Sequence, residues 1–115
     1  MARQRLSLDT LGDILRSEGW DVVVQDDVIA RRDDVPGVWM LYADAAGRVR
    51  LEATRDVGVP QAARIREGNR EYRVLREQQE VVNILTTIES EDDLTEVLHT
   101  LEDILHRRRW EDSAF

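Results

Sequence analysis

Residues 20–54 read WDVVVQDDVIARRDDVPGVWMLYADAAGRVRLEAT, and this stretch contains the clearest signals of the architecture. Runs rich in Val, Ile and aromatic residues alternate in it with polar turn residues, which is typical of antiparallel strands joined by short connections. We expect strands over residues 21–25, 28–31, 38–43 and 48–54. The run from Val38 to Ala43 is apolar on both alternating faces, which predicts a central strand covered by helices on one side and by a partner or second layer on the other.

Two amphipathic helices bracket this stretch. The first has leucines and an isoleucine on one helical face from residue 6 to 15, Ser7 or Asp9 as a cap, and Gly19 as a stop. The second begins after Ser90, with Asp93 reaching back as in a capping box. Its apolar stripe, which should lie on the sheet, consists of Leu94, Val97, Leu98, Leu101, Ile104 and Leu105.

Residues 60–89 allow two interpretations. Pro60 fits the first turn of a helix that runs through Ile65 to about Asn69. Residues 81–88 match helical spacing, but the β-branched side chains crowded there favour a buried strand. We predict a helix over 60–69 and then a hairpin that pairs 72–77 with 81–89 across Gln78 and Gln79. A continuous helix from 61 to 89 is the alternative.

These elements predict an α+β fold in the order helix, strands, helix, two strands, helix, with one antiparallel β-sheet and the helices on one face. A chain of 115 residues suits one core, so we expect a single chaperone-like domain over 1–115 with a short flexible tail from about residue 110. No apolar run approaches the ~20 residues of a membrane helix, and the first residues lack a hydrophobic signal region. We expect a cytoplasmic location.

Composition excludes several kinds of chemistry. The chain has no cysteine, and its 16 basic residues are all arginine, so thiolate ligation and Schiff-base lysines are excluded. His99 and His106 share a helix face but are separated by ~10 Å of rise, too far to bind one ion without other ligands. Paired aspartates recur at positions that turns and a helix start explain. We expect no catalytic residue, no cofactor and no metal site.

The net charge of −8 opposes attraction to nucleic acid and anionic lipid and favours a basic partner. An arginine cluster interrupts this acidic background at Arg64, Arg66, Arg70, Arg73 and Arg76. The interleaved glutamates predict a solvated, internally paired surface. A docking patch for an acidic partner, or for a subunit's own acidic helix start at Glu91–Asp93, is the first alternative. Direct contact with nucleic acid is the second.

Aromatic residues complete the candidates for partner binding. Trp20, Trp39, Tyr42 and Tyr72 begin strands or lie in them, where packing explains them. Trp110 follows three arginines beyond the apolar stripe, where it either folds back over the core or anchors a neighbour. The residues we single out for partner binding are Trp39, Arg66, Arg70, Arg73 and Trp110.

The string AARIREGNREY at residues 62–72, together with the order of the elements, resembles the YbjN-like family, whose fold is that of type III secretion chaperones. The resemblance spans about residues 6 to 108. It implies a middle helix that ends in the pair Asn69 and Arg70 before a strand. It also implies a non-enzymatic homodimer that binds other proteins.

The expected function is therefore protein binding, chaperone-like or as an adaptor, by a homodimer that forms through the uncovered face of the sheet or an exposed edge. The expected partners are a second copy and another, basic protein, with no membrane and no direct nucleic acid. The alternative is a nucleic-acid-associated regulator that acts directly through the arginine cluster or through a basic DNA- or RNA-binding partner.

Overall fold

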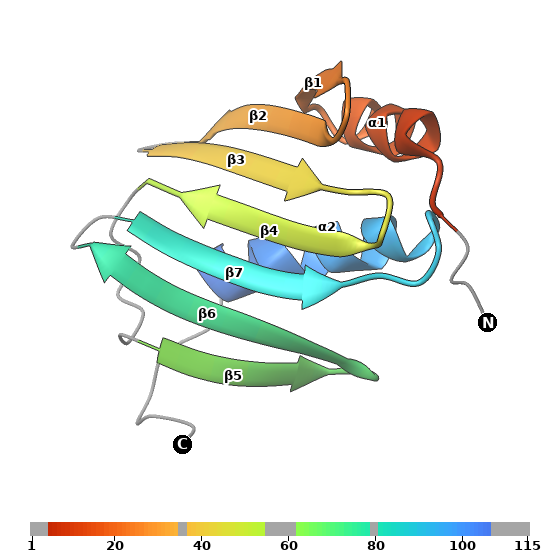
Figure 1. Ribbon diagram of the computed structural model, residues 1–115. Coiled ribbons are helices and arrows are strands. Elements are labelled where there is room, and N and C mark those ends of the chain that lie inside the picture. Colours follow the sequence, from red (N-terminus) through yellow and green to blue (C-terminus); the bar gives the residue numbers. More distant parts are fainter. Residues whose placement is uncertain (1–4, 35–36, 55–61, 79–80, 107–115) are drawn as a thin grey trace.

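The computed structural model describes residues 5–34, 37–54, 62–78 and 81–106. Seven strands form one antiparallel sheet in the order β1-β2-β3-β4-β7-β6-β5, and two helices lie on one of its faces (Figure 1). The elements are α1 (Leu8–Ser17), β1 (Asp21–Val24), β2 (Val28–Asp34), β3 (Gly37–Ala43), β4 (Arg48–Ala53), β5 (Ala62–Glu67), β6 (Arg70–Gln78), β7 (Val81–Thr87) and α2 (Asp93–His106).

The first four strands form the predicted meander, with each strand antiparallel to the next. The connection between β3 and β4 depends on Gly47, which has a positive φ of 90°. Its carbonyl accepts the N–H of Ile88 at 2.7 Å, which ties this turn to the chain just after β7. A Cβ on Gly47 would collide with the carbonyl of Ile88, so only glycine fits both requirements.

The helix predicted over residues 60–69 is wrong, and so is the predicted order of elements. Residues 62–67 form β5, in which Ala63 and Ile65 are buried while Arg64 and Arg66 are exposed. This alternation has a period of two, and β6 supplies the hydrogen bonds that an edge strand needs, for example where Ile65 pairs with Tyr72. Tertiary pairing therefore overrides the local helix propensity of the alanine-rich segment. The middle helix implied by the YbjN-like resemblance is absent from the described part of this segment.

The hairpin predicted after this segment is confirmed, because β6 and β7 pair in antiparallel register from Arg73 with Leu85 to Gln78 with Val81. A continuous helix over these residues is thereby excluded. The turn itself, at residues 79–80, lies outside the described residues. Since β7 pairs with β4 on its other side, it joins the β5–β6 hairpin to the meander.

The core lies between the sheet and the two helices. The largest fully buried side chains include Trp39 and Leu41 from β3, Leu51 from β4, and Ile84 from β7. The helices contribute Leu11 and Leu15 from α1 and the predicted stripe of α2, whose six members are all buried. Each fully buried aliphatic side chain stabilises the fold by roughly 1.5–3 kcal/mol, so this layer holds α2 on the sheet.

Side-chain caps fix the start of each helix. The hydroxyl of Ser7 accepts the N–H of Thr10 at 3.2 Å, which identifies Ser7 rather than Asp9 as the cap of α1. The Asp93 carboxylate accepts the N–H groups of Glu89 at 2.9 Å and Ser90 at 3.1 Å, which is the half of the predicted capping box in which Asp93 reaches back. Glu91 also accepts the N–H of Ser7 at 2.6 Å, which ties the two helix starts together.

Candidate functional site

The face of the sheet opposite the helices carries no helix among the described elements, and we call it the open face. Backbone register aligns one open-face side chain from every strand, because directly paired residues of antiparallel strands point to the same side. In spatial order this transverse row is Val23, Ile29, Tyr42, Arg50, Leu85, Arg73 and Arg64. The row is apolar over β1–β3 and becomes cationic over β4–β5.

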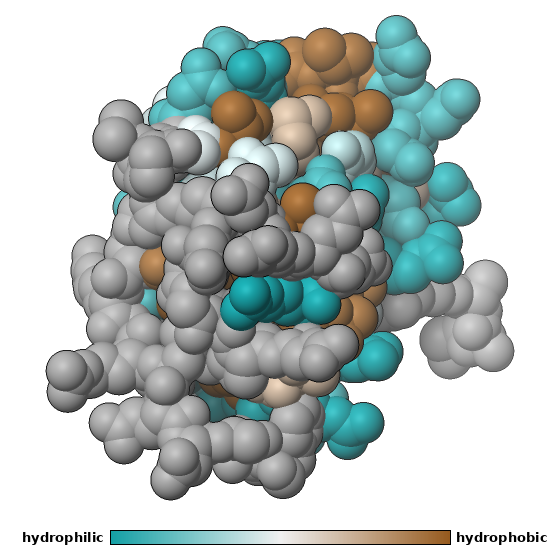
Figure 2. Space-filling model, turned by 90° about the vertical axis from the view of Figure 1, so that its left-hand side faces the viewer, coloured by the Kyte–Doolittle hydropathy of each residue, from teal (hydrophilic) through white to brown (hydrophobic). Residues whose placement is uncertain are grey.

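The apolar end of the open face comprises Val23, Ile29, Val38, Met40 and Tyr42. Val23 is 54% exposed and Ile29 is 41% exposed, although both are large apolar residues. The other three are half-buried. In the side view of Figure 2, apolar surface gathers at the top of the molecule, where Figure 1 places β1, β2 and α1. Exposed aliphatic side chains that are neighbours form a patch that another surface can cover.

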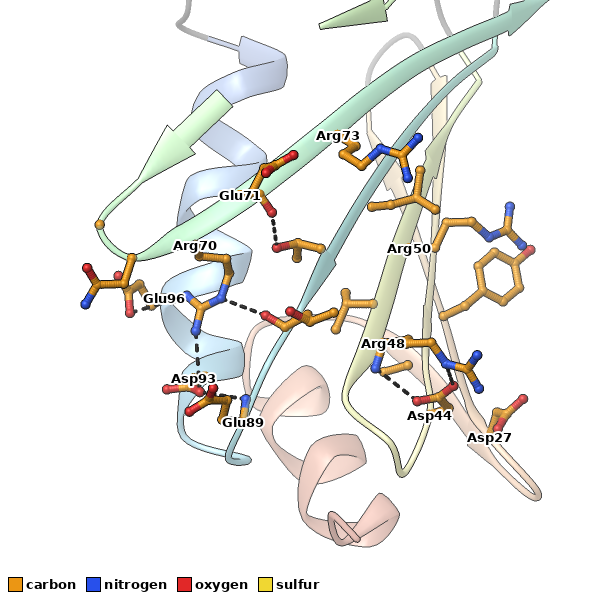
Figure 3. A pocket seen from close by; sticks show the side chains of 18 residues that line it. Asp27, Asp44, Arg48, Arg50, Arg70, Glu71, Arg73, Glu89, Asp93 and Glu96 are labelled. Carbon is orange, nitrogen blue, oxygen red and sulfur yellow. Dashed lines mark hydrogen bonds and ion pairs between the residues drawn. The ribbon is translucent and has the colours of Figure 1, made fainter. Parts of the chain in front are cut away.

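The cationic end borders a hollow of about 910 Å³. It forms because the β5–β6 hairpin separates from β7 beyond the pair Arg73 and Leu85. Beyond this pair, two side-chain hydrogen bonds connect β6 to the chain of β7 in place of backbone hydrogen bonds. The Thr86 hydroxyl donates to the carbonyl of Glu71 at 2.6 Å, and Arg70 Nε donates to the carbonyl of Thr87 at 2.8 Å (Figure 3). We call this space the arginine hollow, because its lining includes Arg48, Arg50, Arg70 and Arg73. Six carboxylates also line it: Asp27, Asp44, Glu71, Glu89, Asp93 and Glu96.

Arg70 has a structural role at this hollow. Its guanidinium also lies 3.4 Å from the Asp93 carboxylate and 3.7 Å from that of Glu96, and only 15% of its side chain is exposed. The N–H of Glu89 is the main cause that lowers the pKa of Asp93; burial opposes it, and the Ser90 N–H and the Arg70 charge add to it. Arg70 therefore binds the acidic helix start of its own chain. That helix start is one of the predicted partners of the arginine cluster.

Arg48 and Arg50 enter the hollow from β4. Arg48 donates through Nε to Asp44 at 2.8 Å. Partial burial raises the pKa of Asp44, but the N–H groups of Arg48 and Ala46 and the Arg48 guanidinium together lower it. Arg50 lies 4.2 Å above the ring of Tyr42 and donates to Asn83 Oδ1 at 3.0 Å.

Arg73 is exposed on β6, on the same side of the sheet as Arg50 (Figure 3). Neither of these two arginines forms an ion pair with a carboxylate among the described residues. Leu85 lies between them in the transverse row. The centre of the hollow is therefore an apolar side chain flanked by two cations that lack counter-charges.

The residues singled out from the sequence are scattered over the structure. Trp39 is 1% exposed on the covered face, with the Arg32 guanidinium 4.5 Å from its ring, so it offers no surface in a single chain. Arg66 lies on the open face of β5, 3.9 Å from Glu71. Arg70 and Arg73 both border the hollow, on opposite sides of β7 (Figure 3). Trp110 lies outside the described residues.

Arg48, Arg50, Tyr42 and Leu85 belong to this site but were not among the singled-out residues. The alternation over residues 48–54 identified one water-facing side of that strand. No pattern in the sequence connects β4 with β6, because the register of β7 between them brings Arg50 and Arg73 together.

Charge is distributed unevenly between the two layers. From residue 89 to residue 106 the chain has no arginine, and its acidic residues there are Glu89, Glu91, Asp92, Asp93, Glu96, Glu102 and Asp103. This segment lies with α2 on the helix side. The arginines of the transverse row lie on the opposite face, so the open face is less acidic than the net charge of −8 suggests.

Other classes of site have little support. No group of three or more potential metal-ligating side chains comes together within the described ranges. His99 is exposed on α2, with Nε2 3.7 Å from Glu18. None of the helices in the described part of the chain is long and apolar enough to span a membrane.

Comparisons with protein-family models, with curated proteins and with solved structures found no match to this chain. The YbjN-like resemblance therefore stays a prediction.

Proposed function

We propose that this protein is a non-enzymatic, cytoplasmic homodimer that binds other proteins in a chaperone-like or adaptor role. The two copies meet through the apolar end of the open face. The observation that carries the proposal is the exposure of Val23 and Ile29, at 54% and 41%, side by side in the transverse row. The covered face of the same strands is packed against helices, whereas no described element packs on their open face.

The dimensions of the apolar end predict a weak dimer. Three strands at a spacing of ~4.8 Å and about six residues long present roughly 300 Å² in projection. A stable interface buries about 800 Å² on each partner, so this contact is below the standard size. Dissociation constants for such contacts fall in the micromolar range or above, and we expect association to depend on concentration.

Sedimentation velocity over a hundredfold range of protein concentration tests this dimer. The double variant Val23→Thr, Ile29→Thr keeps β-branched side chains but makes the patch polar, so we expect it to remain monomeric at concentrations where the native chain dimerises. Val22→Thr is the matched control: it lies on β1 but faces the core, so it should weaken folding without weakening association. A native chain that stays monomeric over the whole range would remove the proposal.

A nucleic-acid-associated regulator is the second candidate, favoured by the arginines that share the open face. Direct binding predicts salt-sensitive retention of single or double strands, lost in Arg73→Glu. Arg70→Glu would also disrupt the contacts to Thr87, Asp93 and Glu96, so Arg73→Glu is the cleaner variant. Regulation through a basic DNA- or RNA-binding partner predicts instead that the isolated protein retains no nucleic acid.

A further inference from the structure

The strand β5 forms one edge of the sheet, and none of the described elements pairs with its outer side (Figure 1). We infer that this edge binds an extended segment of another protein, which adds a strand to the sheet and places carboxylates beside Arg64 and Arg66. The inference rests on the proposed protein-binding function and names the chemistry of the bound segment. It uses the edge of the sheet opposite β1, whereas the proposed dimer uses β1–β3.

The backbone groups that face outward from β5 belong to Arg64 and Arg66. A two-residue turn joins β5 to β6, so the pair of residues that closes this turn exchanges backbone hydrogen bonds. Bonded and non-bonded pairs alternate along an antiparallel ladder, so every second residue of β5 directs its N–H and C=O away from β6. The carbonyl of Glu71, which is paired with Arg66, agrees with this pattern because it accepts the Thr86 hydroxyl on the β7 side. An added strand can therefore form backbone hydrogen bonds with Arg64 and Arg66.

The charges beside this edge favour a segment that carries carboxylates. On the open face of the β5–β6 hairpin the described charged side chains are Arg64, Arg66 and Arg73 and the single carboxylate Glu71. Arg64 and Arg66 each lie 3.9 Å from Glu71, beyond hydrogen-bonding distance, and their side chains are 69% and 68% exposed. Arg64 is also directly opposite Arg73, and like charges in such a pair destabilise a sheet. A carboxylate on the outer side of Arg64 offsets that repulsion.

Most carboxylates of the arginine hollow lie away from this edge. Of the six, Glu71 is the one on the β5–β6 hairpin. Asp93 and Glu96 are on α2, where they contact Arg70. The other three are next to the ends of β2, β3 and β7. Because β6 separates β5 from β7, the two backbones are about 10 Å apart, close to the Debye length at 0.1 M salt.

A second copy of β5 does not suit this edge. Two β5 strands paired antiparallel about a twofold axis would place arginines of one copy beside arginines of the other on the open face. Charged side chains on an edge strand are a common protection against such self-pairing. The occupant is therefore a strand with the opposite charge pattern.

Strand geometry defines the pattern of the bound segment. The residues opposite Arg64 and Arg66 are two positions apart, about 6.7 Å, and they point to the open face together with the two guanidinium groups. The residue between them points to the covered side, next to Ile65, which is 8% exposed. An apolar, β-branched side chain suits that position. The expected sequence alternates acidic, apolar and acidic residues, as in Glu-Val-Glu.

The edge favours a peptide over nucleic acid. Strand addition uses the regularly spaced N–H and C=O groups of a polypeptide, which a nucleic acid lacks. Single strands of nucleic acid gain much of their affinity by stacking bases on aromatic side chains. Tyr72 is the one aromatic residue of the described β5–β6 hairpin, and it is 1% exposed, so it offers no ring for stacking.

Titration with defined peptides, followed in two-dimensional amide NMR spectra, tests the inference, because these spectra detect weak binding and identify the amides affected. The probe is a ten-residue peptide with the central sequence Thr-Glu-Val-Glu-Thr, and the reference peptide has Thr-Gln-Val-Gln-Thr. We expect the largest shifts at the amides of Arg64 and Arg66. We expect the acidic peptide to bind about fivefold more tightly, because cross-strand pairs of opposite charge are favourable but exposed here.

Methylation of single peptide nitrogens tests strand addition separately from charge. A methyl group on the nitrogen of the second glutamate removes an N–H that faces β5, and we expect it to weaken binding about tenfold. A methyl group on the nitrogen of the valine is the matched control. It removes an N–H that faces solvent, so binding should stay within about twofold of the unmodified peptide.

The protein variant Arg64→Gln should weaken binding of the acidic peptide about threefold. Arg31→Gln is its control, because it removes the same charge from an exposed position on β2, and it should leave binding unchanged. Equal affinity for both peptides, equal effects of the two methyl groups, or shifts centred away from β5 would overturn the inference. Absence of binding would also overturn it and leave the arginines as protection against self-pairing. A ten-residue oligothymidylate that shifts the same amides at lower concentration would overturn it in favour of nucleic acid.

The dimer and the β5 edge can fail separately. Sedimentation of the native chain decides the dimer, and the peptide titration decides the edge. The variant Val23→Thr, Ile29→Thr lies at the opposite side of the sheet, so we expect it to bind the acidic peptide as tightly as the native chain. Such binding supports the edge even if the native chain is monomeric. Binding that is lost in this variant would show that the peptide needs the apolar end, and would overturn the site on β5.

Discussion

Replacing Arg70 with methionine should lower the free energy of unfolding by about 2–3 kcal/mol. The guanidinium holds three elements together at the point where β6 leaves β7. It donates to the Thr87 carbonyl at 2.8 Å and lies 3.4 Å from Asp93 and 3.7 Å from Glu96 on α2. Methionine keeps most of the apolar stem, so the change removes mainly the charge and its donors.

The magnitude follows from the exposure of each group. A hydrogen bond to a charged group contributes about 1.5–3 kcal/mol, and the Arg70 side chain is 15% exposed. The pair with Glu96 adds little, because 64% of the glutamate side chain is exposed. Loss of the Asp93 pair removes one of the causes that lower the pKa of that carboxylate. For 115 residues, each 1 kcal/mol corresponds to about 4 °C in Tm, so the expected decrease is about 8–12 °C.

Urea unfolding followed by circular dichroism measures this change, with Arg73→Met as the matched control. Arg73 lies on the same strand but is exposed and has no described partner, so its replacement should stay within about 0.5 kcal/mol of the native chain. If Arg70→Met is as mild as Arg73→Met, the guanidinium does not hold the hairpin to α2. The reasoning about this end of the sheet would then be wrong.

Two further outcomes are expected. The pKa of Asp93 is lowered from its ordinary 3.8, so its contribution to stability is present above that pH and is lost as the pH falls through the folded pKa. The variant Asp93→Asn should therefore show a shallower loss of stability below about pH 4 than the native chain. An unchanged acid profile would contradict this. Gly47→Ala should destabilise the chain by clearly more than the about 1–2 kcal/mol of a left-handed alanine, because its Cβ meets the Ile88 carbonyl. Gly19→Ala is the control: its φ is 93° and the space around it is open, so it should destabilise the chain by about that amount. Equal losses of stability in chemical denaturation would exclude the clash.

The arginine hollow could be predicted only in part from the sequence. The arginine cluster over residues 64–76 made Arg70 and Arg73 candidate residues, and one alternative predicted a contact with the acidic helix start. In the structure Arg70 is largely buried and binds α2 and Thr87, whereas Arg73 is exposed. Arg50 is the second cation, and it comes from a strand more than 20 positions earlier. Side chains so distant in sequence are brought together by strand register, which local patterns do not encode.

The elements with local signals could be predicted from the sequence. Alternating apolar residues and a required glycine defined the meander, and caps and an apolar stripe defined both helices, because these depend on neighbours within a few residues. The strand at residues 62–67, by contrast, depends on tertiary pairing. Their alanines and arginines favour a helix in isolation, but pairing with β6 satisfies the backbone and buries Ala63 and Ile65. Only tertiary pairing, too, placed β7 between β4 and β6 and so brought Arg50 and Arg73 to either side of Leu85.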